Sequence, residues 1–87
     1  MSAFLLNISS PDGNIFSGNA ERITLRGSEG DFAVLAGHIP FITSVKKGEC
    51  AVHLEDGSIR RGHTEGGLLT VGKEEVTFLT ASLSFED

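Results

Sequence analysis

The chain has 87 residues, with 12 acidic side chains against seven Lys and Arg and a formal net charge of −5. This length corresponds to one domain, and the acidic balance argues against a nucleic-acid-binding protein, which needs Lys and Arg in excess. The single cysteine excludes an internal disulfide framework and a cysteine-cluster zinc site.

Apolar side chains recur at every second position along most of the chain. Phe4, Leu6 and Ile8 alternate with other residues, as expected when one face of a strand is buried. Eleven glycines, distributed along the chain, indicate many turns between such runs. In chain order, the pattern predicts strands near residues 3–9, 14–20, 21–26, 31–35, 41–46, 49–55, 58–64, 67–71 and 75–81.

The connections between these runs are short. Asp56-Gly57 is typical of a two-residue hairpin turn, and Gly37 and Pro40 interrupt the only apolar stretch that could begin a helix. The tail, 81–87, is too short for a stable helix. We therefore predict one all-β domain over 1–87, a sandwich of two mainly antiparallel sheets with roughly nine to ten short strands.

Few residues suggest catalysis. There is no Gly-x-Ser-x-Gly motif, and Cys50 falls on the apolar side of its strand, where a buried structural thiol is expected. A hydrolase that uses His38 or His63 stays open as an alternative, but we expect the chain not to be an enzyme.

Metal and cofactor sites are also weakly indicated. His53 and His63 flank a turn and could meet across a hairpin, with Glu55 or Glu65 as a third ligand, but two imidazoles alone make a poor zinc site. We therefore expect no metal and no cofactor. Lys46-Lys47 is similar to the modified lysine of lipoyl or biotinyl carrier domains, although its sequence context differs, so a small acidic carrier or ligand-binding β domain is the main alternative function.

The most informative segment is 27–41. It contains two carboxylates between glycines, then an apolar stretch, then a Gly-His-x-Pro corner that Pro40 makes rigid. This order predicts a docking edge that is acidic at one end and apolar beside it.

The chain resembles the N-terminal β-sandwich domain of the epsilon subunit of F-type ATP synthases, whose mitochondrial equivalent is called delta. The matching motifs, in the order and spacing of the family, are Ser10-Pro11-Asp12-Gly13 with Ile15-Phe16-Ser17-Gly18, Ala20-Glu21-Arg22-Ile23, Gly27 to Pro40, Phe41 to Gly48, Gly66-Gly67-Leu68-Leu69-Thr70-Val71 and Val76-Thr77-Phe78-Leu79. Ala33, Ala36 and Glu65 depart from the residues that are usual in the family.

The resemblance implies a non-catalytic rotor subunit of the central stalk. Its partners would be the gamma subunit and the c-ring, and it would help couple ion translocation to ATP synthesis. The resemblance covers the N-terminal domain only, so we expect no inhibition or ATP sensing through the C-terminal helical hairpin of typical members. It also implies a peripheral position on the cytoplasmic face of an energy-transducing, bacterial plasma membrane, through the complex and without a lipid anchor.

The resemblance also assigns residues to the two partners. The residues expected to face the c-ring are Glu29, Gly30, Asp31 and His38. The residues expected to face gamma are His38, Ile39, Pro40, Ile42, Thr43, Gly66, Gly67, Leu68, Leu69, Thr77 and Leu79. For the apolar residues in this second set, packing in the core is the rival interpretation, since a pattern alone does not tell which strand face is buried.

Overall fold

The computed structural model describes residues 3–37 and 39–86, which form nine β-strands. The strands are β1 (Phe4–Ser10), β2 (Gly13–Gly27), β3 (Gly30–Leu35), β4 (Phe41–Val45), β5 (Gly48–Leu54), β6 (Ile59–Thr64), β7 (Gly67–Val71), β8 (Glu75–Thr80) and β9 (Leu83–Phe85). The described residues contain no helix, and hence no helix that could cross a membrane.

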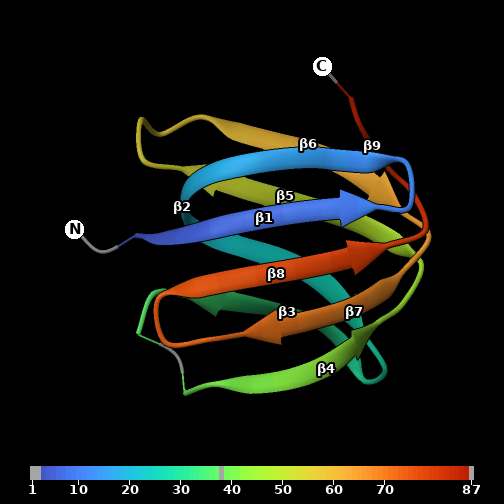
Figure 1. The fold of residues 1–87 in the computed structure, drawn as a ribbon, viewed down its shortest axis with the longest axis horizontal. Coiled ribbons are helices and arrows are strands. Elements are labelled where there is room, and N and C mark those ends of the chain that lie inside the picture. The colour runs from blue at the N-terminus through green and yellow to red at the C-terminus, as the bar shows by residue number, and fades with distance from the viewer. Residues whose placement is uncertain (1–2, 38, 87) are drawn as a thin grey trace.

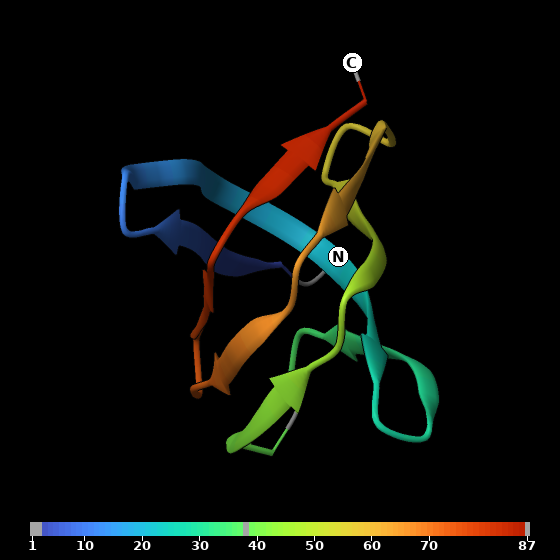
Figure 2. The ribbon, with the colours of Figure 1, turned by 90° about the vertical axis from the view of Figure 1, so that its right-hand side faces the viewer.

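The strands form two layers that share one strand (Figures 1 and 2). One layer contains β4, β7, β8 and β1, and the other contains β3, β5, β6 and β9. The long strand β2 joins them, because its first half pairs with β1 and its second half pairs with β3 and β5. Hydrogen bonding therefore runs through all nine strands as one continuous sheet folded into a sandwich, rather than through two separate sheets.

A single apolar core lies between the layers. Leu6, Ile8 and Phe78 point into it from one layer, and Ile23 and Val52 point into it from the other, all with fully buried side chains. Dense packing of this kind makes the domain stiff, because close-packed interiors have low compressibility.

The predicted all-β sandwich is confirmed, and so is the mainly antiparallel pairing, with β1 and β8 as the one parallel pair among those described. Three details were wrong. The predicted strands 14–20 and 21–26 are one strand, because a bulge between Ala20 and Arg22 shifts the alternation without ending the ladder. The Asp56-Gly57 turn belongs to a four-residue connection, since His53 pairs with Ile59. Strand β9 was also missed, since its three residues are too few for a visible pattern.

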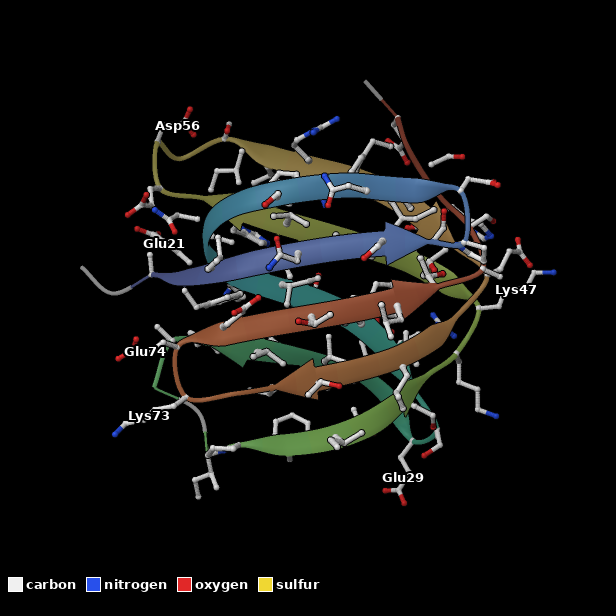
Figure 3. The ribbon with its side chains drawn as sticks, in the orientation of Figure 1. Glu21, Glu29, Lys47, Asp56, Lys73 and Glu74 are labelled. Atoms are coloured by element: carbon white, nitrogen blue, oxygen red, sulfur yellow. The ribbon has the colours of Figure 1, made fainter. Side chains whose placement is uncertain are left out.

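The connections gather at the two ends of the sandwich (Figure 3). Glu29, between β2 and β3, and Lys47, between β4 and β5, lie at one end, whereas Asp56, Lys73 and Glu74 lie at the other. The first end is fastened by a hydrogen bond from the Lys46 amide to the Arg26 carbonyl, 2.7 Å long. The two ends therefore present different loops on one rigid body.

Candidate docking surfaces

One outer surface of the sandwich is apolar. The registers place Ile42 beside Thr70 and Thr77, and Leu68 beside Leu79, as two rows across β4, β7 and β8. We call these five outward side chains the apolar face. Alternation along each strand explains the set, because the residues between them point into the core.

The apolar face is accessible. Ile42 is 66% exposed, Leu79 is 50% exposed and Leu68 is 44% exposed. None of these five side chains is charged. The surface beside them is polar, because Asn7 of β1 receives a hydrogen bond from Ser17 and donates one to Glu75 of β8. Exposed apolar side chains that are contiguous in this way are typical of protein–protein contact sites.

The residues assigned to gamma divide into three groups. Ile42, Leu68, Thr77 and Leu79 lie on the apolar face, and Ile39 and Pro40 are exposed just before β4. Thr43 and Gly67 are partly buried, and Gly66 is buried between backbone segments.

For Leu69 the rival interpretation holds. Its side chain is 0% exposed, because it alternates with Leu68 on β7 and points into the core, so it cannot contribute to a docking surface. Sequence reasoning missed Thr70 and the exposed Leu5 of β1, which continues the apolar surface. Only the pairing between strands identifies them, since single-strand patterns do not fix which strands are neighbours.

A second surface is the tip of the β2–β3 hairpin, Gly27 to Asp31, which we call the acidic hairpin. Gly27 pairs with Gly30, so Ser28 and Glu29 form a tight turn, and the positive φ of Gly30 (121°) favours glycine there. Glu29 and Asp31 are both exposed. The Arg26 Nε atom lies 3.5 Å from Asp31 Oδ1, an exposed pair that holds neither side chain strongly.

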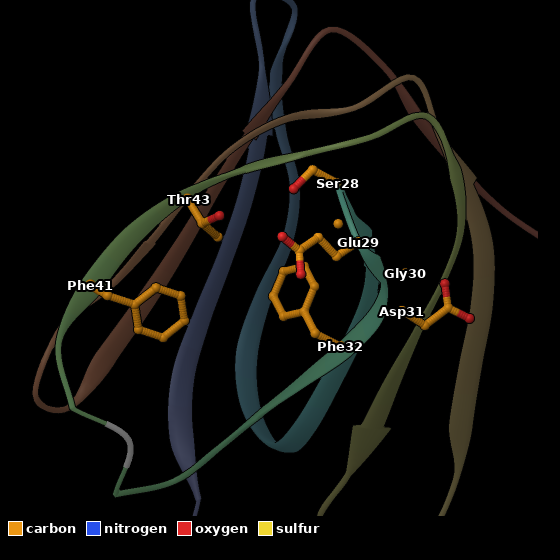
Figure 4. Close-up of a pocket in the computed structure, with 8 residues that line it drawn as sticks. Ser28, Glu29, Gly30, Asp31, Phe32, Phe41 and Thr43 are labelled. Carbon is orange, nitrogen blue, oxygen red and sulfur yellow. The ribbon is translucent and has the colours of Figure 1, made fainter.

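The acidic hairpin borders a shallow depression of about 300 Å³ (Figure 4). Phe32 and Phe41 line it together with Glu29, Asp31 and Thr43. The Asp31 side chain points away from the Phe32 ring (Figure 4), because neighbouring residues on a strand alternate. The depression therefore combines an apolar wall with a carboxylate at its rim.

The described residues assigned to the c-ring lie together at the acidic hairpin. Glu29, Gly30 and Asp31 precede or begin β3, whereas Gly37 and Ile39 follow the far end of that strand. His38 lies outside the described residues. The acidic hairpin and the exposed Ile39 therefore lie beyond opposite ends of β3.

The metal and catalytic alternatives gain no geometric support. His53 pairs with Ile59 and His63 pairs with Glu49, so the two imidazoles are four positions apart along the hairpin, and no cluster of three metal-ligating side chains occurs among residues 3–37 and 39–86. His63 instead lies 3.6 Å from Glu65, whose other oxygen is 3.8 Å from the Lys47 Nζ atom.

Cys50 is the buried structural thiol that the sequence predicted. Its side chain is 4% exposed, and burial, with Glu49 nearby, raises the pKa of the thiol to about 11. A thiol in this state is protonated at neutral pH and is a poor nucleophile.

Comparisons with known proteins agree with the fold and the motifs. Residues 3–85 match the family described as "ATP synthase, Delta/Epsilon chain, beta-sandwich domain". The chain is 36% identical over 77 residues to the "ATP synthase epsilon chain, sodium ion specific" of Acetobacterium woodii, a match that covers 88% of this chain and 58% of that protein.

Two solved structures are similar as well. A chain of the Euglena gracilis mitochondrial ATP synthase (OSCP/F1/c-ring) has a TM-score of 0.89 and 26% identity, over 95% of this chain and 53% of that one. A chain of the Tetrahymena thermophila enzyme (central stalk/c-ring) shares the fold, with a TM-score of 0.77 and 13% identity, over 93% of this chain and 65% of that one. The chain thus spans between about half and two thirds of the length of these relatives, and it belongs to the ATP synthase delta/epsilon chain family, of which residues 3–85 form the β-sandwich domain.

Proposed function

We propose that the chain is a non-catalytic subunit of the central stalk of an F-type ATP synthase, where it connects the gamma subunit to the c-ring. The observation that carries the proposal is the pairing of an exposed apolar face with a separate acidic hairpin on one stiff sandwich. A part that transmits torque needs two contact sites and little internal compliance. The apolar face and the acidic hairpin would be the two contact sites, and the close-packed core makes the sandwich stiff. Family membership supports the same role.

The apolar face would bind gamma. Ile42, Leu68 and Leu79 are large and exposed, so covering them removes apolar area from water at roughly 25 cal/mol per Å², before the costs of association. Ile39 and Pro40 would extend this contact from the neighbouring corner. Because the face is uncharged, this contact would supply most of the affinity.

The acidic hairpin would meet the c-ring. Exposed Glu29 and Asp31 would pair with cationic side chains of the ring, contacts that are each worth only about 0–1 kcal/mol. Such pairs set the register and the salt sensitivity of docking more than its strength. In this arrangement the domain is peripheral to the membrane, and in a bacterial cell it would lie on the cytoplasmic side.

Mixing the purified chain with the gamma subunit of the same enzyme tests the role directly. We expect a stable complex that co-elutes in size-exclusion chromatography and gives a saturable isotherm in calorimetry. A negative heat-capacity change should accompany binding, because apolar surface is buried. A folded chain that forms no complex with gamma would refute the proposal and favour a carrier or ligand-binding domain.

Reversing the charge of the acidic hairpin should weaken coupling without unfolding the domain. In the Glu29→Lys/Asp31→Lys variant we expect less ion-driven ATP synthesis by the reconstituted enzyme, and a larger deficit at low salt, where repulsion is least screened. The domain should unfold at nearly the same temperature, because both side chains are exposed.

The matched control is Glu55→Lys/Glu74→Lys, which makes the same change in charge in the exposed loops at the opposite end of the sandwich. Equal losses in the two variants would mean that net charge, rather than the acidic hairpin, affects coupling.

A further inference from the structure

The outer surface of the second layer differs from the apolar face. The registers place Leu35, Arg22, His53 and Ile59 in one row across β3, β2, β5 and β6. The next row contains the small residues Ala33, Thr24 and Ala51 and ends at Arg61, so Arg61 lies diagonally next to His53. Two arginines thus flank one imidazole on an exposed surface.

Arg22 and His53 are in direct contact. One terminal nitrogen of the guanidinium, Nη2, lies 3.3 Å from Nδ1 and 3.4 Å from Nε2 of His53, so it lies over the ring rather than in line with a single nitrogen. The remaining N–H donors of the guanidinium are not used by this contact, since an arginine side chain carries five.

Neither arginine has a carboxylate partner within residues 3–37 and 39–86. In that part of the chain, Arg26, Lys47 and His63 form ion pairs instead. Arg22, Leu35 and His53 line a shallow depression of about 250 Å³, and Glu21 borders it. Arg61 lines a neighbouring depression together with Asp31 and Glu49. None of these three carboxylates is within ion-pair distance of the two arginines. Unpaired cations next to each other are notable in a chain with a net charge of −5.

The environment of His53 disfavours its protonated form. Partial burial first, and then the charges of Arg22 and Arg61, lower the pKa of His53. Protonating His53 is therefore less favourable than protonating an ordinary imidazole, through partial burial and through these two charges. An anion above the ring would cancel this repulsion.

We propose that Arg22, His53 and Arg61 form a binding site for a single oxyanion, the phosphate group of a small molecule or the carboxylate of an acidic ligand. Arg22 donates its free N–H groups in the fork geometry that suits such groups, and Arg61 contributes charge from the other side. His53 becomes a third donor when it takes up a proton. The site lies on a different layer from the apolar face, so its occupation is independent of docking to gamma.

The test follows the histidine rings of the purified chain by NMR while sulfate or acetate is added at constant ionic strength. We expect saturable shifts of the His53 resonances and tighter binding as the pH falls, because the bound anion favours protonated His53 and linkage is reciprocal. Sulfate acting at lower concentration than acetate would indicate a phosphate-type ligand, and the reverse order would indicate a carboxylate; both results support the site.

Three variants make the test specific. Arg22→Gln and Arg61→Gln should each weaken anion binding by roughly tenfold, as expected when a charged donor is lost. Lys73→Gln, which removes an equal charge from the β7–β8 turn of the other layer, should have no effect. His63, next to Glu65, serves as an internal reference in every spectrum. The proposal is overturned if chloride at the same ionic strength shifts the His53 resonances as much as sulfate and acetate do. It is also overturned if the His53 and His63 resonances shift alike, or if the shifts do not saturate and so report an adventitious ion only.

Discussion

Replacing Leu68 and Leu79 by glutamate should abolish binding of the chain to gamma. The two side chains are neighbours on the apolar face, because Leu68 pairs with Leu79 across β7 and β8. Burying a leucine in an interface contributes about 1.5–3 kcal/mol, and an unpaired carboxylate forced into the same position adds a further penalty. We therefore expect Leu68→Glu/Leu79→Glu to raise the dissociation constant by more than about 100-fold, measured by calorimetry.

The fold should survive this change, since both side chains are about half exposed in the free chain. The matched control is Leu35→Glu, which alters a leucine of similar exposure (47%) on the outer surface of the other layer. Full binding by the control and loss of binding by the double variant would locate the contact. If both variants bind gamma like the unaltered chain, the apolar face is not the docking surface.

The fold class was predictable because its signals are local. The sequence alone shows the period-two alternation, the glycine-rich turns and the single uninterrupted domain. Recognising them does not depend on which strands are neighbours in the sheet. The bulge in β2 was not predictable in the same way. Ala20 and Ile23 are both fully buried although two residues separate them, and a break in alternation of this kind looks like the end of one strand and the start of another.

The docking surfaces were only partly predictable, for a different reason. A strand such as β7 shows two alternating sets of residues, and both sets are apolar here, since Leu68 and Leu69 are adjacent. Which set is buried depends on the partner layer, so Leu69 was assigned together with Leu68 although only Leu68 is exposed. The acidic hairpin was easier to predict, because carboxylates between two glycines at a turn can hardly be buried.

The Arg22–His53 contact could not have been predicted from sequence. The two residues are 31 positions apart, and the register that brings them together depends on the bulge at Ala20/Arg22. A shift by one residue would turn Arg22 toward the core. The same irregularity that hid the true length of β2 therefore also creates the cationic surface of the second layer.

Gly67 should be the glycine least tolerant of a side chain. It begins β7 between β4 and β8, opposite Val45 and Thr80. A Cβ atom built at this position overlaps the carbonyl oxygen of Leu79 and lies 2.9 Å from the Thr80 Cα atom. These obstacles are backbone atoms of a paired strand, so no rotamer change can relieve them, and Gly67→Ala must push β8 away from β7.

We therefore expect Gly67→Ala to lower the free energy of unfolding by at least about 3 kcal/mol, the upper range for overpacking. In a domain of this size, that loss corresponds to a fall in melting temperature of roughly 12–24 °C. Gly18→Ala is the matched control, since a Cβ atom there meets only the Phe16 ring at 3.5 Å, an ordinary contact. Its stability should change by less than about 1 kcal/mol.

Because Leu68 and Leu79 lie in the same two strands, Gly67→Ala should also weaken gamma binding at temperatures where the variant is still folded. A variant as stable as the control would show that β7 and β8 are not as closely paired as their register implies.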